Sequence, residues 1–332
     1  MKKLLNQPEN YADEALAGMC EAHPEIYRML GETGRVIART KPMLAGKVGV
    51  VSGGGSGHLP TFAGYVGEGL LDACSVGNVF AGPSVLDCVD AVKVADGGAG
   101  VLLLYGNYGG DRMNFDMAAE MLEEDHIPTA TVLIADDVGS AAHAERAKRR
   151  GVAGLIYAYK CAGAKAEAGC KLDAVTATAR KAVDATVSIG AALTSCTVPE
   201  AGKPTFTIAE GEMELGMGIH GEPGIRRGPL MTADDVADEM LARLLDDSGI
   251  GKGEQVSVLV NSLGATPLEE LYILYHRVSK CLKEKGIHIM LPRVGRYATS
   301  MEMAGASLSL FRLDDELTQL LHAPARCPFW SN

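Results

Sequence analysis

Short apolar runs, glycine-rich turns and helix-like stretches alternate along residues 47–160. This alternation predicts βαβ units and therefore an α/β fold with a largely parallel sheet. Ligands of such sheets bind at the carboxyl ends of the strands. We therefore expect the turns after Ser52 and after Tyr105 to be neighbours and to form part of a ligand site. The expected strands of this sheet span residues 47–52, 100–105, 129–134 and 152–157.

The length of the chain and the order of its elements predict two domains. A chain of 332 residues is about twice as long as a typical domain. Strands and helices stop alternating after an alanine-rich helical stretch at 164–186. We therefore expect an N-terminal α/β domain with glycine-rich ligand loops at 1–186 and a C-terminal α+β domain at 187–332. Further strands are expected at 189–198, 204–208, 254–260, 287–290 and 307–313.

Helices are expected where apolar residues recur at helical spacing. In the first half these are residues 11–22, a stretch that begins at Pro60, residues 84–95 and a stretch that runs through Leu122. Pro60 is expected in the first helical turn because its fixed φ angle suits that position. In the second half, residues 267–283 form one long predicted helix.

Charge and hydropathy exclude two classes of partner. The net charge of −11 argues against a nucleic-acid or anionic-membrane surface, since such surfaces need clustered lysine and arginine. We interpret the one basic cluster, Lys148–Arg150, as the solvated end of a helix, where cations suit the helix dipole. No apolar run approaches membrane-spanning length, and the N-terminus lacks the apolar region of a signal peptide.

The eight cysteines are scattered and form neither a Cys-x-x-Cys pair nor a metal-ligand spacing, so no metal site is predicted. Most of them lie in apolar or Ala/Gly-rich stretches, where cysteine serves as a small core residue. Such usage is typical of a reducing compartment. We therefore expect a cytoplasmic protein.

The first candidate site is the glycine cluster that follows the expected strand 47–52. Consecutive glycines let backbone N–H groups approach a ligand closely. His58 stands where the dinucleotide-binding pattern requires its last glycine, and the phosphate-loop pattern occurs nowhere in the chain. A plain tight turn would account for one or two glycines. A ligand loop accounts better for the whole segment Ser52–His58.

Asp111 and His220 are the other two candidates. Asp111 follows the strand 100–105 and precedes a helical run, so it could cap the helix and could also take a proton from a substrate hydroxyl. His220 lies in the glycine-rich segment Gly218–Gly224, which leaves room for a ligand beside the imidazole. A lone histidine is more often structural or simply exposed. Here Glu222 could orient the ring.

Five segments resemble the substrate-binding K subunit of the dihydroxyacetone kinases, and the resemblance extends over essentially the whole chain. It implies that His220 forms a hemiaminal with the ketone carbonyl and that Asp111 is the base that acts on the hydroxyl. It also implies that His58 assists catalysis. The substrate would be held by Gly55, Ser56, Gly57, His58, Gly106 and Asp111. The five segments are Ser-Gly-Gly-Gly-Ser-Gly-His (52–58), Asn-Tyr-x-Gly-Asp-x-x-Asn-Phe (107–115), Cys-Thr-Val-Pro (196–199), Gly-Ile-His-Gly-Glu-Pro-Gly (218–224) and Asn-x-Leu-Gly-Ala-Thr-Pro (261–267).

Covalent capture suits the chemistry of the substrate. A neutral imidazole nitrogen adds to a carbonyl, and histidine has an unperturbed pKa near 6.5, so most of it is neutral in the cell. Glycerol has no carbonyl, and capture would therefore reject it without a shape filter. Two positions depart from the family pattern: Gly106 replaces a common ligand-contacting lysine, and Leu59 replaces a frequent glutamate.

The resemblance also implies partners. The sequence shows no nucleotide site, so no cofactor is expected in this chain, and ADP or ATP with magnesium is expected on an L-type partner subunit. Bound ADP would be recharged by an M protein of the phosphotransferase system, or else ATP would exchange. The chain itself is expected to form a homodimer.

Two other functions stay open at this point. One is a ketone-sensing paralogue that captures the ligand and then activates a transcription factor. Such a sensor would need His220 but no base, so the presence of Asp111 favours the enzyme. The other is a kinase subunit for a four-carbon ketose such as erythrulose, for which Gly106 and Leu59 would leave room.

Overall fold

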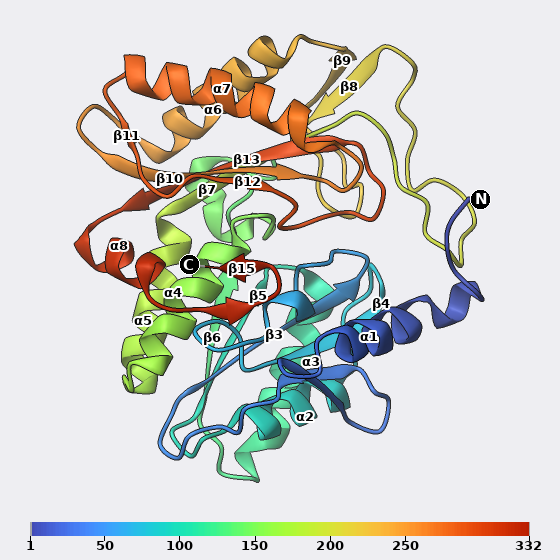
Figure 1. Ribbon diagram of the computed structural model, residues 1–332, viewed down its shortest axis with the longest axis vertical. Coiled ribbons are helices and arrows are strands. Elements are labelled where there is room, and N and C mark those ends of the chain that lie inside the picture. The colour runs from blue at the N-terminus through green and yellow to red at the C-terminus, as the bar shows by residue number, and fades with distance from the viewer. Residues whose placement is uncertain (1, 332) are drawn as a thin grey trace. The chain divides into compact units, whose positions relative to one another are not determined.

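The computed structural model describes residues 2–331, which form two compact units (Figure 1). The chain passes between the units several times. The first unit contains the residues up to Ile134, Leu155–Ala182 and the residues from Gln319 onward, and the second contains Ala135–Gly154 and Val183–Thr318. The boundary predicted after residue 186 lies close to the passage at Val183. The sequence had placed residues 135–154 and those from 319 onward with the opposite halves.

A six-stranded mixed sheet forms the first unit, in the order β1-β2-β4-β3-β5-β6. The four strands β4, β3, β5 and β6 are parallel neighbours, whereas β1, β2 and β4 pair in antiparallel fashion. The prediction of a largely parallel sheet is confirmed. The strands are β1 (Tyr27–Leu30), β2 (Val36–Arg39), β3 (Gly49–Ser56), β4 (Ala73–Val79), β5 (Val101–Gly106) and β6 (Thr129–Ile134).

Helices cover both faces of this sheet (Figure 1). On one face, α2 and α3 share an apolar core with β3 and β5 that includes Val51, Leu103 and Phe115. On the other face lies α4, where the hydroxyl of Tyr159 is 2.9 Å from Oγ of Ser52. The helices are α1 (Tyr11–Ala22), α2 (Val85–Ala95), α3 (Gly109–Glu123), α4 (Leu155–Glu167) and α5 (Leu172–Asp184), with 3₁₀ turns η1 (Pro8–Asn10) and η2 (Ala63–Tyr65).

The end of α8 (Asp315–His322) and the residues after it complete the first unit. The residues after the helix form a short hairpin of β14 (Arg326–Cys327) and β15 (Trp330–Ser331). The N–H of Arg326 donates to the carbonyl oxygen of Glu68 at 2.9 Å, which joins the hairpin to the loop before β4.

Two predicted elements of the first half are wrong. The strand expected at 152–157 is the start of α4, which is buried at every residue from Leu155 to Ala164. A helix buried on all sides shows no polar face, so its period cannot be told from that of a buried strand. The helix expected from Pro60 is a series of turns with η2. Tertiary packing decides this segment, because the Phe62 ring fills the space beside Gly54 of β3.

A seven-stranded sheet forms the second unit, in the order β11-β10-β13-β7-β8-β9, with β12 beside β10. β11 and β12 are parallel to β10, and the other neighbours are antiparallel, as expected for an α+β unit. The strands are β7 (Thr186–Ala192), β8 (Glu212–Leu215), β9 (Arg226–Pro229), β10 (Gln255–Ser262), β11 (His288–Ile289), β12 (Arg293–Gly295) and β13 (Gly305–Leu313).

The apolar faces of α6 (Ala233–Ser248) and α7 (Leu268–Glu284) pack on one face of this sheet, where they share a core with its strands (Figure 1). The helix predicted at 267–283 is confirmed as α7, whereas α6 was not predicted. The residue that could have indicated the start of α6 in the sequence is Thr232. Its hydroxyl caps the helix by accepting the N–H of Asp235.

The strand expected at 204–208 is wrong. Pro204 forms a single bridge with Thr197, and the segment around it is largely exposed, so it has no neighbour with which to form a ladder. The strand expected at 189–198 is shorter and earlier, as β7. Within residues 2–331, no helix has both the length and the apolar composition needed to cross a bilayer.

Candidate functional site

Three loops meet at the carboxyl edge of the first sheet. They follow β3, β4 and β5, and β3 lies between the other two strands. A Cβ atom placed on Gly55 would lie 2.7 Å from the N atom of Ala81, in the loop after β4. A Cβ atom placed on Gly82 would lie 3.3 Å from Oδ1 of Asp111, in the segment after β5. The predicted neighbourhood of the turns after Ser52 and Tyr105 is therefore confirmed.

Packing accounts for the glycines at positions 53–55. All three lie within β3 rather than in the loop, and a Cβ atom on any of them would overlap a neighbour. Gly53 faces Ser75 and Phe115, and Gly54 faces Phe62. The part of the cluster that forms a loop starts after Ser56, with Gly57 in a left-handed conformation at φ +98°.

His58 is held between two aromatic rings. Its imidazole stacks on Phe80 with ring centroids 4.9 Å apart, and the edge of Phe62 meets it at 6.0 Å. The residue is only 1% exposed. Phe80 has a positive φ of 60°, which is uncommon for a residue with a side chain and is frequent at ligand sites. Phe80 was not predicted from sequence, because its contact with His58 depends on the pairing of β3 with β4.

Asp111 is the third residue of α3 and not its N-cap, which is Tyr108. The interpretation of Asp111 as a helix cap is therefore wrong. Its half-buried carboxylate lies within the first turn, where the helix dipole favours a negative charge. Burial raises the pKa of the nearby Cys88 thiol to about 12, and the negative charge of Asp111 adds to that shift. Gly106 is the buried last residue of β5, where it pairs with Ile134 of β6.

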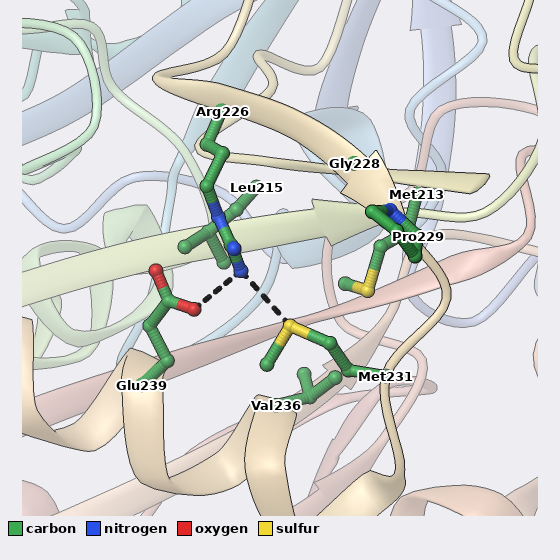
Figure 2. A pocket seen from close by; sticks show the side chains of 8 residues that line it. All are labelled: Met213, Leu215, Arg226, Gly228, Pro229, Met231, Val236 and Glu239. Carbon is green, nitrogen blue, oxygen red and sulfur yellow. Dashed lines mark hydrogen bonds and ion pairs between the residues drawn. The ribbon is translucent and has the colours of Figure 1, made fainter.

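His220 lies in the loop that joins the antiparallel strands β8 and β9 of the second unit. The last pair of this hairpin is Leu215 with Arg226, so residues 216–225 form the loop. Figure 2 shows how β9 is tied to α6: Nη2 of Arg226 donates to Oε2 of Glu239 at 2.6 Å and to Sδ of Met231 at 2.9 Å. The histidine therefore sits on a loop whose two ends are both fixed.

Glu222 holds the His220 ring. Nδ1 of His220 lies 2.9 Å from Oε1 of Glu222, and the backbone N–H of His220 donates to Oε2 at the same distance. Burial would raise the pKa of Glu222, but these hydrogen bonds and the charge interaction with His220 outweigh it and hold the pKa at about 2. The carboxylate is therefore ionised at neutral pH and accepts the Nδ1 hydrogen. In a neutral imidazole of this tautomer, the lone pair is on Nε2.

The backbone of the loop is fixed from both sides. The hydroxyl of Ser300 donates to the carbonyl oxygen of Ile219, immediately before the histidine. Oε1 of Glu214 accepts the N–H of Gly224 at 2.6 Å. Gly221 has a φ of +87°, which favours glycine, and a Cβ atom there would meet Phe206 at 2.7 Å. The 23% exposed side chain of His220 is thus presented by a loop with little freedom.

Arg149 and Arg150 are not a solvated helix end, and that interpretation is wrong. They follow the 3₁₀ turn η3 (His143–Lys148), and Arg149 is 3% exposed in a two-pronged ion pair with Asp247, at 2.5 and 2.8 Å. Arg150 points to the histidine loop, where Nη2 donates to the carbonyl oxygen of Gly216 at 3.0 Å. The sequence shows that basic residues are clustered here, but it does not show which distant carboxylates form ion pairs with them.

The predicted site residues thus divide between the units. Gly55–His58, Gly106 and Asp111 belong to the first unit, where they lie around neighbouring loops, and His220 belongs to the second. Residues 17–329 match the Dak1 domain family. The chain belongs to this family.

Relatives of nearly the same length include a Listeria innocua protein, "PTS-dependent dihydroxyacetone kinase 2, dihydroxyacetone-binding subunit DhaK". The two are 47% identical over 99% of each chain. An "L-erythrulose kinase" of Pectobacterium atrosepticum is 44% identical over 99% of this chain, which spans 56% of that longer protein. Among solved structures, "Dihydroxyacetone kinase operon co-activator Dha-DhaQ" matches with a TM-score of 0.88, 30% identity and coverage of 94% of this chain and 96% of that one. This Dak1 protein therefore has relatives that differ in substrate and in role.

Proposed function

We propose that this Dak1 protein is the hydroxyketone-binding subunit of a multi-subunit dihydroxyacetone kinase, a phosphotransferase with an alcohol group as acceptor. The observation that carries the proposal is the pair of His220 and Glu222, which leaves the ring lone pair on Nε2. The relative of equal length, a dihydroxyacetone-binding subunit by name, supports the same assignment. The substrate is a short ketose with a hydroxymethyl group beside the carbonyl.

Nε2 of His220 attacks the carbonyl carbon. A C–N bond forms, the π electrons of the carbonyl move to its oxygen, and that oxygen takes a proton from water. The ring carries a positive charge as the bond forms, and the carboxylate of Glu222 at Nδ1 stabilises this charge. The Nδ1 proton then passes through Glu222 to the hydroxide left by that water, which gives a neutral hemiaminal and restores the carboxylate. Glycerol has no carbonyl carbon to be attacked, so it is not captured.

Asp111 takes the proton from the substrate hydroxyl as that oxygen attacks the phosphoryl group. A base in reach of the nucleophile typically contributes a factor of about 10² to 10⁴. The capture of the carbonyl fixes the position of the hydroxyl, and positioning is a main source of rate in phosphoryl transfer. Gly55–His58 hold the substrate, and the buried imidazole of His58 assists.

The nucleotide belongs to an L-type partner subunit, which carries ADP or ATP with magnesium. A phosphotransferase-system M protein recharges the bound ADP, and the name of the Listeria relative supports this donor. The chain acts as a homodimer, and the cytoplasm is the expected compartment on the basis of composition.

Dihydroxyacetone labelled with ¹³C at the carbonyl tests the capture directly. Adduct formation converts a trigonal carbon into a tetrahedral one bonded to oxygen and nitrogen, so a new ¹³C resonance is expected far from the ketone signal. The matched control is His220→Asn, which should lose this resonance and keep the fold. The proposal fails if the variant gives the same resonance, or if the wild type binds the ketone and shows only the trigonal carbon.

A four-carbon ketose is a second candidate substrate. Gly106 provides no side chain at the end of β5, where the family commonly has a ligand-contacting lysine. This absence of a side chain favours a longer substrate, and the 44% identical relative is named as an L-erythrulose kinase. Capture itself would serve both ketoses, because each has a ketone beside a hydroxymethyl group.

A further inference from the structure

A chain of charged groups lies behind the histidine loop. Asp137 and Arg150 come from the segment Ala135–Gly154, which belongs to the second unit although it precedes α4 in sequence. Oδ2 of Asp137 accepts Nε of Arg150 at 2.9 Å and lies 2.7 Å from Nη2. The other oxygen of Asp137 accepts the N–H of Gly139 at 2.9 Å. Asp137 is therefore fixed at both oxygens, and it fixes the plane of the guanidinium.

The same guanidinium reaches the loop of His220. Nη2 of Arg150 donates to the carbonyl oxygen of Gly216, and Nη1 lies 4.0 Å from Oε2 of Glu222. Glu222 in turn accepts the backbone N–H and the Nδ1 hydrogen of His220. The other contacts of Arg150 set the orientation of its guanidinium. Its positive charge therefore lies near Oε2 of Glu222, whereas the imidazole contacts Oε1.

Gly218 leaves the space in which these two side chains meet. A Cβ atom on Gly218 would lie 2.6 Å from Nη1 of Arg150 and would overlap Oε2 of Glu222. Both atoms are the ends of flexible side chains, so an added methyl group would displace them. Gly218, two residues before His220, is therefore required for the packing of Glu222 and Arg150.

We propose that Asp137 and Arg150 are positioning residues for His220, which they act on through Glu222. They hold the carboxylate where it binds the Nδ1 hydrogen, so that the lone pair of the neutral ring stays on Nε2. The consequence for ketone capture rests on the proposed function, whereas the effect on the tautomer does not. A purely structural ion pair would have no effect on the imidazole, and Arg149 with Asp247 provides such a pair in the same segment.

The test measures the tautomer of His220 in the absence of any ketone. In protein labelled with ¹⁵N-histidine, the ring nitrogens of His220 are assigned by comparison with His220→Asn. The wild type is expected to show a protonated Nδ1 and an unprotonated Nε2. Arg150→Gln is expected to shift a large part of the population to the Nε2–H tautomer, which free imidazole side chains prefer. The matched control Arg149→Gln also removes a buried, paired arginine and is expected to keep the wild-type tautomer.

Two further variants separate positioning from general damage to the fold. Gly218→Ala displaces the ends of Glu222 and Arg150 without a backbone penalty and is expected to change the tautomer as Arg150→Gln does. Arg150→Lys keeps the charge but not the planar fork, so a partial return to the wild-type tautomer is expected. The proposal is overturned if Arg150→Gln and Gly218→Ala, both folded by circular dichroism, keep the wild-type tautomer, or if Arg149→Gln changes it equally.

Ketone binding is then measured with the same proteins. Arg150→Gln is expected to weaken capture about tenfold, the size typical when a group that orients a functional histidine is removed. If no protein, wild type included, forms an adduct while Arg150→Gln still changes the tautomer, the proposed function fails and the positioning role stands. If the wild type forms the adduct and Arg150→Gln retains its tautomer, the proposed function stands and the positioning role fails.

Discussion

Oε1 of Glu222 and Nδ1 of His220 are 2.9 Å apart, two residues along one loop. The pKa of this glutamate, about 2, means that its carboxylate stays charged down to a pH far below that of the cell. A charged acceptor bound to one ring nitrogen decides which nitrogen keeps the lone pair. The loop therefore carries both the nucleophilic ring and the carboxylate that orients it.

Replacement of Glu222 by alanine removes that acceptor. Glu222→Ala is expected to weaken dihydroxyacetone binding at least tenfold, because hydrogen bonds to charged groups are worth about 1.5–3 kcal/mol. Calorimetric titration measures the affinity. Glu239→Ala, which removes the bond from Arg226 to α6 in the same hairpin, is the control and should leave the affinity nearly unchanged. Equal affinities of Glu222→Ala and wild type would contradict the role of the carboxylate.

Replacement of Asp111 by asparagine keeps the size of the side chain and removes the base. Asp111→Asn is expected to bind the ketone and to lose a factor of about 10² to 10⁴ in turnover with a competent L-type partner. A coupled phosphorylation assay measures turnover, and the ¹³C resonance of the adduct reports binding. Turnover within a few-fold of wild type would leave Asp111 with a role only in the first turn of α3. A co-activator, in contrast to a kinase subunit, would keep its full activity in this variant.

Burial of Asp137 gives the protein a pH dependence of its own. Burial is the largest cause that raises the pKa of this carboxyl, from 3.8 to about 6, and the neighbouring Asp136 adds to it while Arg150 opposes it. Between these two values the native state binds more protons than the unfolded chain, so this contribution to stability decreases as the pH rises.

The expected result is a difference in the free energy of unfolding between wild type and Asp137→Asn that falls by about 2 kcal/mol from pH 4 to pH 6.5. Above that range the difference should be constant. Urea unfolding at a series of pH values measures it. Native Glu222 does not titrate in this window, because its pKa is about 2. A difference that is flat from pH 4 to 7 would show that Asp137 has an ordinary pKa.

The glycines of β3 give a stability prediction. Gly54→Ala places a methyl group against the ring of Phe62 and is expected to destabilise the protein by about 1–3 kcal/mol, the usual cost of overpacking. Gly18→Ala is the control: this glycine lies inside α1 with nothing near its Cβ position, and alanine should stabilise the helix by up to about 1 kcal/mol. Thermal unfolding measures the stability of both variants relative to wild type. A neutral Gly54→Ala would mean that Phe62 moves aside easily.

Position 106 is expected to influence the length of the substrate. A lysine at Gly106 would add several methylenes and a cation at the end of β5. The ratio of kcat/KM for dihydroxyacetone to that for erythrulose is expected to rise in Gly106→Lys by about 10-fold to 200-fold, the range for one methylene-sized difference in fit. Both enantiomers of erythrulose are assayed with the same partner subunit. An unchanged ratio would show that another position selects the substrate.

Much of the first sheet could be predicted from sequence because its strands are short apolar runs bounded by glycine. Thr129–Ile134 was predicted with its observed bounds, and so was the first helix, Tyr11–Ala22. α4 could not be predicted, since its apolar residues cover the whole surface of the helix and leave no polar face to read. β1 and β2 are only four residues long, and β4 depends on pairing with β2 and β3, which are distant from it in sequence, so these three strands were not predicted.

Those residues of the candidate site that stand in short sequence motifs could be predicted. His220 and Asp111 stand in segments typical of the family, and Glu222 is close enough to His220 in sequence for its contact to be expected. Arg150 differs, because its partner Glu222 is 72 positions away and its own neighbours suggested a solvent-exposed charge run. Phe80 was missed for the same reason: only the pairing of β3 with β4 brings it to His58.

The hairpin of β14 and β15 gives the first unit an unusual dependence on order of synthesis. This hairpin follows the whole second unit in sequence, yet it packs with the first, where Gly67 and Gly69 leave room for residues 324–327. On the ribosome, the first unit therefore cannot complete its fold until the whole second unit has been synthesised. Trp330, the single tryptophan, is 2% exposed in this last strand. Its fluorescence during refolding would therefore report when the hairpin packs onto the first unit, and the second unit would contribute no tryptophan signal.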